Sequence, residues 1–378
     1  MMGRVRSIET AENLSGLVVM VRAALNVPVE NGKVTDDFRL EKAMQTIDFL
    51  LKKNARVILA SHLSDSKGSL LPIYEHLKSR LPISIVDDIA GPKAREAAHA
   101  LKPGNVLMLQ NLRWNPGEES NDEQFARELS SLADVYVADD FTVAHREHAG
   151  VVGVPKFLPS YAGFQFMAEI EGLSPALEPK SPSIAIVGGA KFITKEILIK
   201  TLLKKYDRLF IGGAIVNDFL LAKGYEVGKS LVSKTDHVKP LLENSKIILP
   251  VDVTVSNPNG NEDRSVDDVH GNDSIYDIGP KTLELLRPTL EKSATILWNG
   301  PLGLFEKGFR KATDVLAKMI SETSAHSIVG GGDTIASIQS LNLIEKFTFV
   351  STAGGAMLDF LANGTLPGIE ALKNTRTV

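Results

Sequence analysis

The chain contains no cysteine, which excludes disulfide bonds, thiolate metal sites and a cysteine nucleophile. It also lacks an excess of positive charge, because 42 Lys and Arg face 46 Asp and Glu and leave a formal net charge of −4. No stretch approaches the roughly 20 apolar residues that span a bilayer. We therefore expect no nucleic-acid and no membrane partner, and we expect local clusters of Lys and Arg wherever an anion binds.

The beginning of the chain lacks the apolar run of a signal peptide and instead carries Arg4, Arg6 and Glu9. A chain without cysteine also fits a reducing compartment. Both features favour a cytoplasmic location.

The length and the spacing of apolar runs predict two α/β domains. A chain of 378 residues exceeds what one hydrophobic core usually supports, at about 150 residues per domain. Short β-branched runs alternate with longer segments of helical periodicity, which is typical of βαβ units and parallel sheets. We expect strands at residues 17–21, 56–60, 83–86, 106–109, 135–138, 183–187, 208–211, 247–251, 295–298, 327–329 and 347–350. Helices are expected at residues 39–52 and 122–132.

The domain boundary is expected where Pro and Gly cluster, at Val154 to Gly163. A polar segment with helical spacing, Phe166 to Leu177, follows before the next strand. We place a hinge here, with an N-terminal domain at residues 1–160 and a C-terminal domain beginning at residue 161. The segment Asn257 to Asp273 contains many Asn, Gly and Asp residues and is expected to be an exposed loop or excursion.

Five expected strands of the second half run directly into turns of small residues. These turns are Gly188-Gly189, Gly212-Gly213, Asn299-Gly300-Pro301, Gly330-Gly331-Gly332-Asp333 and Ala353-Gly354-Gly355. In a parallel sheet they would all lie at the carboxyl edge, where helix N-termini and bare backbone N–H groups suit a phosphate. For any single turn, the alternative is that glycine is simply the least strained residue. Five such turns in one domain favour a phosphate-binding edge.

Charged side chains accompany these turns. Lys191 and Lys195 are four residues apart on what should be the first turn of a helix, so they would face one phosphate chain together. Asp333 could hold the Mg²⁺ of a nucleotide, and Thr334 could reach a phosphate oxygen. The alternatives are a solvated helix face for the two lysines and a helix N-cap for Asp333.

Other phosphate-binding and catalytic fingerprints are missing. Gly228-Lys229-Ser230 does not complete a P-loop, because Lys223 stands where that loop needs a glycine and no expected strand leads into it. The G-x-G-x-x-G dinucleotide motif, the His-Glu-x-x-His zinc motif, the Gly-x-Ser-x-Gly elbow and the EF-hand loop are absent as well. These absences argue against a P-loop enzyme and weaken the case for a dehydrogenase.

The sequence resembles the phosphoglycerate kinase family along nearly its whole length. The strings that carry the resemblance are Arg22 with Asn26-Val27-Pro28, Asp36-Asp37-Phe38-Arg39, Ser61-His62-Leu63, Asn111-Leu112-Arg113, Pro116-Gly117-Glu118-Glu119, Ala144-His145-Arg146, Gly188-Gly189-Ala190-Lys191, Leu249-Pro250-Val251-Asp252, Asp277-Ile278-Gly279-Pro280-Lys281-Thr282, Trp298-Asn299-Gly300-Pro301, Gly330 to Thr334, and Ser351-Thr352 before Gly354-Gly355-Ala356. The resemblance implies two Rossmann-like lobes with parallel sheets joined by a hinge, the first holding 3-phosphoglycerate and the second Mg-ADP or Mg-ATP. It also implies a nucleotide domain at residues 161–352, a segment 353–378 that returns to the first lobe, and a monomer.

The same resemblance implies roles for individual residues. Arg39 would stabilise the phosphoryl group in flight, together with the backbone amides of Gly354 and Gly355 and the side chain of Lys191. The acceptor would be bound by Arg22, Asn26, Arg39, His62, Arg113 and Arg146. The nucleotide would be bound by Gly189, Lys191, Lys195, Gly213, Gly279, Asn299, Pro301, Glu306, Gly332, Asp333 and Thr334, with Mg²⁺ at Asp333.

The acceptor half departs from the family pattern at two positions that meet the substrate. Ala24 replaces the Asp of Arg-Val-Asp-Phe-Asn-Val-Pro, and Asp65 replaces the Arg of His-Leu-Gly-Arg-Pro. Losing a charge-assisted contact and adding an anion beside the substrate phosphate predict use of 3-phosphoglycerate weaker by on the order of 100-fold. Further changes, for which compensated drift is the alternative, are Asp140, Thr142, Val143, Thr194, Ala214, Asp218 and Ala353.

Three functions therefore stay open at this point. The first is a phosphoglycerate kinase with weak use of 3-phosphoglycerate, and the second is a kinase of the same mechanism that acts on a different small anionic carboxylate. Arg39, Lys191 and Asp333 would keep the transfer machinery in that case, while Asp65 would meet an ammonium or hydroxyl group. The third is a nucleotide-binding protein without catalysis.

Overall fold

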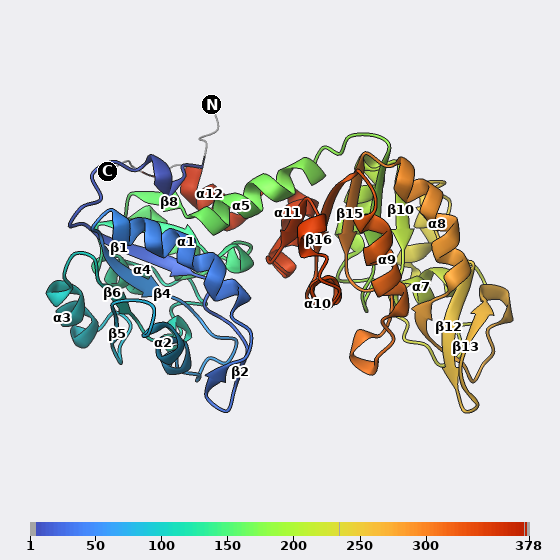
Figure 1. Ribbon diagram of the computed structural model, residues 1–378, viewed down its shortest axis with the longest axis horizontal. Helices are drawn as coiled ribbons and strands as arrows, with labels where there is room; N and C mark the ends of the chain where they lie inside the picture. Colours follow the sequence, from blue (N-terminus) through green and yellow to red (C-terminus); the bar gives the residue numbers. More distant parts are fainter. Residues whose placement is uncertain (1–4, 234, 374, 376–378) are drawn as a thin grey trace. The chain divides into compact units, whose positions relative to one another are not determined.

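The protein is described here by a computed structural model that covers residues 5–233, 235–373 and 375. The chain divides into two compact units (Figure 1). Unit 1 comprises Met1–Ile170 and Thr365–Val378, and unit 2 comprises Glu171–Gly364. Each unit is built on a six-stranded parallel sheet, so the expected α/β fold with two parallel-sheet lobes is confirmed. Within the described ranges, no helix combines the length and the apolar character that crossing a membrane demands.

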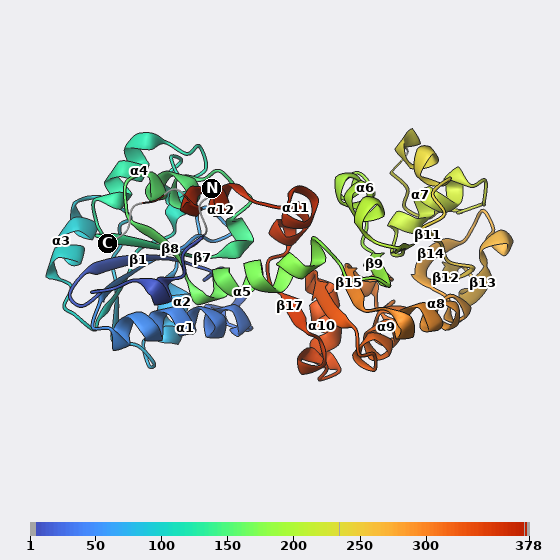
Figure 2. The same cartoon turned by 90° about the horizontal axis from the view of Figure 1, so that it is seen from above.

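Unit 1 contains a parallel sheet with the strand order β5-β6-β4-β1-β7-β8. Its strands are β1 (Val18–Ala23), β4 (Arg56–Ala60), β5 (Ile83–Ile85), β6 (Val106–Met108), β7 (Val135–Asp139) and β8 (Ser160–Ala162), beside a small hairpin of β2 (Val29–Glu30) and β3 (Lys33–Val34). Its helices include α1 (Phe38–Lys52), α2 (Leu71–Leu77), α3 (Pro92–Ala100), α4 (Glu123–Ser130) and α12 (Pro367–Lys373). Figure 2 shows α1 and α4 on opposite faces of this sheet.

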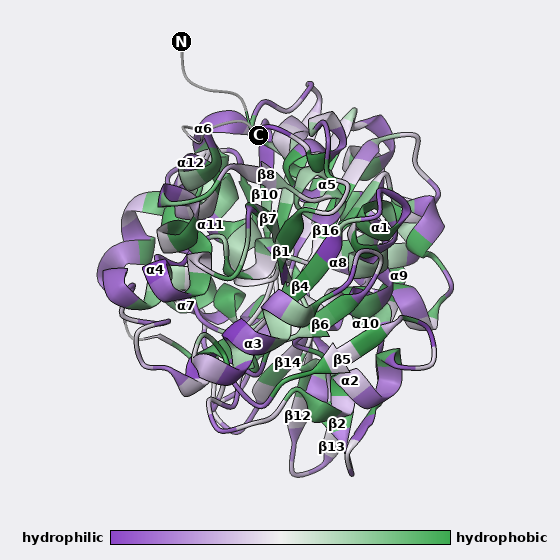
Figure 3. Ribbon diagram, turned by 90° about the vertical axis from the view of Figure 1, so that its left-hand side faces the viewer, coloured by the Kyte–Doolittle hydropathy of each residue, from purple (hydrophilic) through white to green (hydrophobic). Residues whose placement is uncertain are grey.

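The core of unit 1 follows from two periodicities in the sequence. On β1, the buried side chains Val19 and Val21 alternate with residues of the other sheet face. On α1, Leu40, Ala43, Ile47 and Leu50 recur every three or four residues, which forms one apolar stripe that packs on the sheet. Figure 3 shows hydrophobic colours on β4 and β6 and hydrophilic colours on the outer helices α3 and α4. The apolar face of the sheet and the apolar stripe of α1 bury each other, and the charged faces of the helices remain outside.

Unit 2 has a parallel sheet with the strand order β11-β10-β9-β15-β16-β17. Its strands are β9 (Ser183–Val187), β10 (Arg208–Ile211), β11 (Ile247–Ile248), β15 (Thr295–Asn299), β16 (His326–Gly330) and β17 (Phe349–Ser351). Its helices include α6 (Glu196–Lys205), α7 (Ile215–Ala222), α8 (Pro280–Lys292), α9 (Lys311–Ser321), α10 (Gly332–Ser340) and α11 (Gly355–Asn363). In Figure 2, α6 and α7 lie on one face of this sheet and α8 and α9 on the other.

Both sheets contain a topological switch point, where the strand order reverses. In unit 1 the strands β4 and β7 pair with opposite sides of β1, and in unit 2 the strands β10 and β15 pair with opposite sides of β9. Ligands of open α/β sheets bind in the crevice at the carboxyl ends of strands at such a point. The topology therefore directs attention to the segments that follow β1, β4 and β7 in unit 1, and β9, β15 and β16 in unit 2.

Several expectations about segments need correction. The segment Asn257 to Asp273 is an excursion outside the parallel sheet and not a loop, because β13 (Gly260–Ser265) pairs there with β12 (Asp252–Asn257), which also pairs with β14 (Ser274–Ile278). The expected helix Phe166 to Leu177 is α5 (Phe164–Leu173) followed by a 3-10 turn, and the division between units falls within α5 rather than after residue 160. Residues 353–364, which contain α11, belong to unit 2, so the return to unit 1 begins at Thr365. Strand β8 joins the sheet of unit 1 beside β7, which is why that unit extends further.

Candidate active site

The turns that follow β9, β10 and β15 hold one another through backbone hydrogen bonds. Gly189 N–H donates to Pro301 O at 3.0 Å, and Gly213 N–H donates to Leu302 O at 3.1 Å. The backbones approach so closely that a Cβ on Gly188 would lie 2.1 Å from Pro301 O, and a Cβ on Gly213 would lie 2.4 Å from Gly189 N. Gly189 and Gly213 also have φ angles of 101° and 60°, which favour glycine. These glycines are therefore required for the turns to meet at one edge of the sheet.

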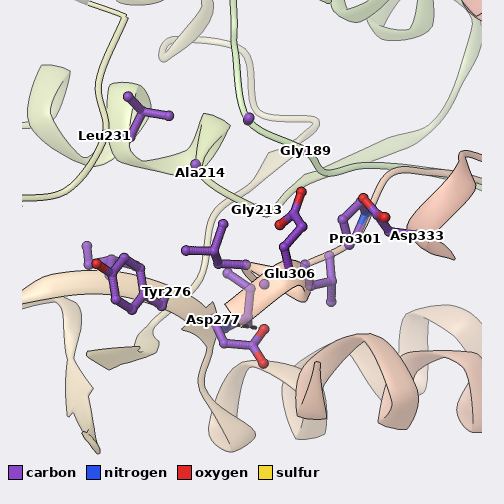
Figure 4. Close-up of a pocket in the computed structure, with 15 residues that line it drawn as sticks. Gly189, Gly213, Ala214, Leu231, Tyr276, Asp277, Pro301, Glu306 and Asp333 are labelled. Carbon is purple, nitrogen blue, oxygen red and sulfur yellow. Dashed lines mark hydrogen bonds between the residues drawn. The ribbon is translucent and has the colours of Figure 1, made fainter. Parts of the chain in front are cut away.

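A cavity of about 200 Å³ opens beside these turns (Figure 4). Five residues expected to bind a nucleotide line it, namely Gly189, Gly213, Pro301, Glu306 and Asp333. Ala214, one of the changed positions, also lines it, and the other lining residues were not expected at the nucleotide: Ala190, Leu231, Ile275, Tyr276, Asp277, Ile278, Leu302, Gly303 and Leu304. Figure 4 shows Leu231 and Tyr276 toward one end of the cavity and Pro301 with Asp333 toward the other. The cavity thus joins an apolar region to an acidic one.

The acidic region contains two neighbouring carboxylates. Burial, and then the negative charge of Glu306, raise the pKa of Asp333 above its usual value. Asp333 is not the N-cap of α10, because Gly331 occupies that position, so the N-cap alternative is wrong. The neighbouring Thr334 is buried, and its Oγ1 has no hydrogen-bond partner within the described part of the chain. A cation at Asp333 and an acceptor for the Thr334 hydroxyl would satisfy these two groups, which fits Mg²⁺ bound to a phosphate chain.

The two lysines differ from each other and from expectation. Helix α6 begins at Glu196, so Lys191 and Lys195 do not share its first turn. Lys191 is exposed but precedes α6 and does not lie on a helix face, whereas the ammonium of Lys195 is enclosed and donates to Gly188 O and to Asn299 Oδ1, each at 2.8 Å. Burial lowers the pKa of Lys195 to about 8. Lys195 therefore ties the turn after β9 to the turn after β15.

Three further residues expected at the nucleotide lie behind or beside the cavity. Asn299 is buried and accepts a hydrogen bond from Lys195. Gly279 is the N-cap of α8, and a Cβ on it would lie 2.3 Å from the carboxylate of Asp252, which accepts hydrogen bonds from the first turn of that helix. Gly332 is the exposed first residue of α10. Asn299 and Gly279 thus support the wall of the cavity rather than line it.

Gly354 and Gly355 form the start of α11 in unit 2. Gly354 is the N-cap residue with a φ of 57°, and Gly355 is the exposed first residue of the helix. Among the described residues, and apart from the adjacent residues and the backbone of the helix itself, no atom lies within 4 Å of a Cβ built on either residue. The start of α11 is therefore open to an approaching group, and the N-terminus of a helix attracts anions.

The switch point of unit 1 carries a cluster of charged side chains, which we call the basic patch and define by Arg22, His62, Arg113 and Arg146 with the carboxylates Glu118 and Asp140. Arg22 lies on β1, His62 follows β4 and Asp140 follows β7. Arg22 Nη2 lies 3.1 Å from His62 Nδ1 and 3.5 Å from Glu118 Oε1, while Arg22 Nη1 lies 3.5 Å from Asp140 Oδ2. The side chains of Arg22, His62, Glu118 and Asp140 are almost fully buried.

His62 is neutral in this surrounding. Burial, followed by the charges of Arg22, Arg113 and Arg146, lowers the pKa of His62 to about 2. Its Nδ1 lies 3.7 Å from Asp140 Oδ2, but a neutral ring makes no ion pair there. Because Arg22 can only donate, Nδ1 must accept, and the ring proton is on Nε2. His62 can therefore offer an N–H group to a ligand.

The other residues expected to bind the acceptor differ in how firmly their side chains are held. Arg39 Nη1 donates to Asn26 O at 3.1 Å, and the side chain of Asn26 is hydrogen-bonded to Ser64. Arg113 is held by Leu63 O at 3.1 Å and by Glu119 at 3.0 Å, whereas Arg146 is exposed. The two altered positions differ in solvent exposure, since Ala24 is buried and Asp65 is exposed.

Comparison with known proteins gives one consistent result. A family model described as phosphoglycerate kinase matches residues 8–364. A phosphoglycerate kinase of Caulobacter vibrioides is 42% identical, with 98% of this chain and 99% of that protein covered, and one of Moorella thermoacetica is 44% identical, with 94% and 95% covered. Among solved structures, phosphoglycerate kinase from Coxiella burnetii has a TM-score of 0.86 at 37% identity, covering 97% of this chain and 98% of that chain. Phosphoglycerate kinase from Pyrococcus horikoshii has a TM-score of 0.87 at 31% identity over the same shares.

Proposed function

Because the chain belongs to the phosphoglycerate kinase family, we propose that it transfers a phosphoryl group between Mg-ATP and the carboxylate of 3-phosphoglycerate, forming Mg-ADP and an acyl phosphate. The observation that carries this proposal is the cavity of unit 2, where glycine turns from three strands meet beside Glu306 and Asp333. We further propose that the protein acts as a cytoplasmic monomer.

Within this proposal, the nucleotide is held mainly by backbone. The amides of the turns after β9, β10 and β16 face the phosphates, Glu306 binds the ribose, and the apolar end near Leu231 takes the base. Asp333 would hold the Mg²⁺ ion, and Thr334 would donate its free hydroxyl to a phosphate oxygen. When bound, Mg²⁺ neutralises charge on the phosphate chain.

The transfer step needs positioning more than covalent chemistry. A carboxylate oxygen of the acceptor attacks the γ-phosphorus, a new P–O bond forms, and the bond to the β-phosphate oxygen breaks as ADP leaves. Lys191, Arg39 and the amides of Gly354 and Gly355 would stabilise the charge on the equatorial oxygens. Because Arg39 lies in unit 1 and the others in unit 2, the proposal includes a hinge motion that brings the two units together on the substrates.

A second candidate function is favoured by the two carboxylates at the acceptor side. Asp140 lies against Arg22 and His62, and Asp65 is an exposed residue that follows Ser64, whose carbonyl oxygen accepts a hydrogen bond from Arg113 Nη1 at 3.3 Å. Both reduce the positive charge available to a phosphate group. A carboxylate that carries an ammonium or hydroxyl group instead of a phosphate would then be the better acceptor.

A steady-state assay with Mg-ATP separates these functions. We expect turnover with 3-phosphoglycerate that saturates and is coupled to ADP release. Acyl phosphate formed from a panel of other carboxylates would be trapped with hydroxylamine, and a better acceptor in that panel would select the second function. Binding of Mg-ADP without transfer to any acceptor would contradict both and leave a non-catalytic nucleotide-binding protein.

A further inference from the structure

Arg22 of the basic patch faces two buried carboxylates. Arg22 faces Glu118 Oε1 and Asp140 Oδ2 at 3.5 Å each, and both carboxylate side chains are fully shielded from solvent. His62 contributes no charge, since its pKa is far below neutrality. Burial raises the pKa of the Glu118 carboxyl. The positive charge of Arg22 is therefore offset within the protein, chiefly by Asp140, before an anionic acceptor can meet it.

Asp140 is held in place on both of its oxygens. Its Oδ1 accepts hydrogen bonds from Thr142 N–H at 3.1 Å and from Thr142 Oγ1 at 2.5 Å, which leaves Oδ2 directed at Arg22 and His62. Glu118 is anchored separately, because its Oε2 accepts from Gly150 N–H at 2.7 Å. The two carboxylates therefore approach the guanidinium from independent supports, and neither can simply turn away.

From this arrangement we infer that Asp140 is a specificity-determining and positioning residue, which engages Arg22 within the protein and lowers the affinity of the acceptor site for phosphate-bearing carboxylates more than its affinity for singly charged ones. The inference rests on the proposed function for its substrate class. Arg22 then positions the ring of His62 through the bond to Nδ1, while Arg39, Arg113 and Arg146 remain to meet the acceptor. Asp140 acts through Arg22 and need not touch the acceptor itself.

The test compares binding of 3-phosphoglycerate and glycerate by calorimetry without nucleotide. In Asp140→Asn, the carboxamide keeps the size and the contacts to Thr142 but removes the charge. We expect affinity for 3-phosphoglycerate to rise about tenfold and affinity for glycerate to rise about threefold or less. In turnover, the change should fall on KM for 3-phosphoglycerate and leave kcat within about twofold. An unchanged ratio of the two affinities overturns the inference.

Three controls isolate the mechanism. Glu147→Gln removes an exposed carboxylate next to Arg146 and should change either affinity by less than about twofold. In an Arg22→Gln background, Asp140→Asn should have no further effect, because Asp140 acts through Arg22. Asp140→Ser, which can still bond Thr142, provides a second neutral variant. If thermal unfolding shows that neither neutral variant folds, the role of Asp140 is structural and the inference fails.

Binding and turnover together separate this inference from the proposed function. The affinity ratio is measured without nucleotide and does not depend on catalysis. Absence of transfer to every acceptor, with the expected shift in affinity ratio, would refute the proposed function and leave the role of Asp140 intact. Normal transfer with an unchanged ratio would do the reverse.

Discussion

The candidate site of unit 2 is formed mainly by backbone groups, whereas that of unit 1 is formed by charged side chains. In unit 2 the cavity is framed by backbone turns whose glycines exclude any side chain, as the 2.1 Å approach at Gly188 shows. In unit 1 the patch consists of side-chain charges, and exchange of a single residue at position 24, 65 or 140 changes its balance. A backbone site tolerates little substitution and so keeps its ligand, whereas a side-chain site can change its ligand without changing the fold. We therefore expect the nucleotide half to be the conventional half of this protein and the acceptor half to be the divergent one.

The largest effect should come from Lys191→Ala. If its ammonium stabilises charge in transit, kcat should fall by about 10²- to 10³-fold while affinity for Mg-ADP falls only a few-fold. The measurement is steady-state turnover beside calorimetry with Mg-ADP. Lys200→Ala, which removes an exposed lysine on α6, serves as the matched control and should leave kcat unchanged. An undiminished kcat in Lys191→Ala would refute its role.

Restoring the acceptor side should have the next largest effect. In the double variant Ala24→Asp with Asp65→Arg, use of 3-phosphoglycerate measured as kcat/KM should rise by on the order of 10- to 100-fold, because two favourable charged contacts are added. The affinity for Mg-ADP, which unit 2 provides, should stay the same. If kcat/KM does not rise, these two positions do not limit the acceptor site, and the contrast between the two units loses its main support.

Asp333→Asn should separate a metal ligand from a nucleotide contact. Affinity for ADP should fall by about tenfold or more when Mg²⁺ is present and change little when it is chelated. Glu306→Gln, which neutralises the other carboxylate of the same cavity, should weaken ADP binding equally with and without Mg²⁺. Equal behaviour of the two variants would contradict the assignment of the metal to Asp333.

The smallest effect concerns pH and Lys195. Its pKa of about 8 means that the free protein loses this charge as the pH rises through 8, whereas a bound phosphate would stabilise the charged form. Affinity for Mg-ADP should therefore be highest below pH 8 and fall about three- to tenfold by pH 9. Calorimetry across pH 7 to 9.5 checks this, and Lys195→Met should show no such decline.

Folding stability should depend on Lys195 in the opposite direction. Its pKa is lowered by folding from 10.5, so between pH 8 and about 10.5 the unfolded chain binds more protons than the native protein. This group's contribution to the free energy of unfolding therefore rises with pH in that window. If Lys195 only ties the two turns together, this stability effect will be seen and the change in Mg-ADP affinity will be absent.

The sequence predicted regular elements well where burial leaves a pattern. Strands Arg56–Ala60, Ser183–Val187 and Arg208–Ile211 are confirmed at both ends, because each is a short apolar run bounded by helices and turns. The strand Gly260–Ser265 was missed, since it is almost fully exposed and has no alternation of polar and apolar residues. Its pairing with β12 is a tertiary fact that composition does not reveal.

The site was predictable in part for a related reason. Glycine turns after consecutive strands must meet at one sheet edge, so their sequence positions were informative. The bond between Lys195 and Asn299 joins residues 104 positions apart, and no local signal indicates it. Leu231 and Tyr276 come from connections outside the parallel sheet, and their presence in the cavity depends on how those connections fold back. The asymmetry of charge around Arg22 likewise required the positions of Glu118 and Asp140.

The most direct measurement is calorimetry of the wild-type protein with Mg-ADP and with 3-phosphoglycerate, each alone and under one buffer. If the nucleotide site is intact, Mg-ADP should bind saturably, and Asp333→Asn should weaken that binding. If the acceptor site has reduced positive charge, 3-phosphoglycerate should bind markedly more weakly than Mg-ADP, and the Ala24→Asp, Asp65→Arg variant should bind it more tightly than the wild type. Failure of Mg-ADP to bind, or 3-phosphoglycerate binding that is tight in the wild type and unimproved in the variant, would contradict the account.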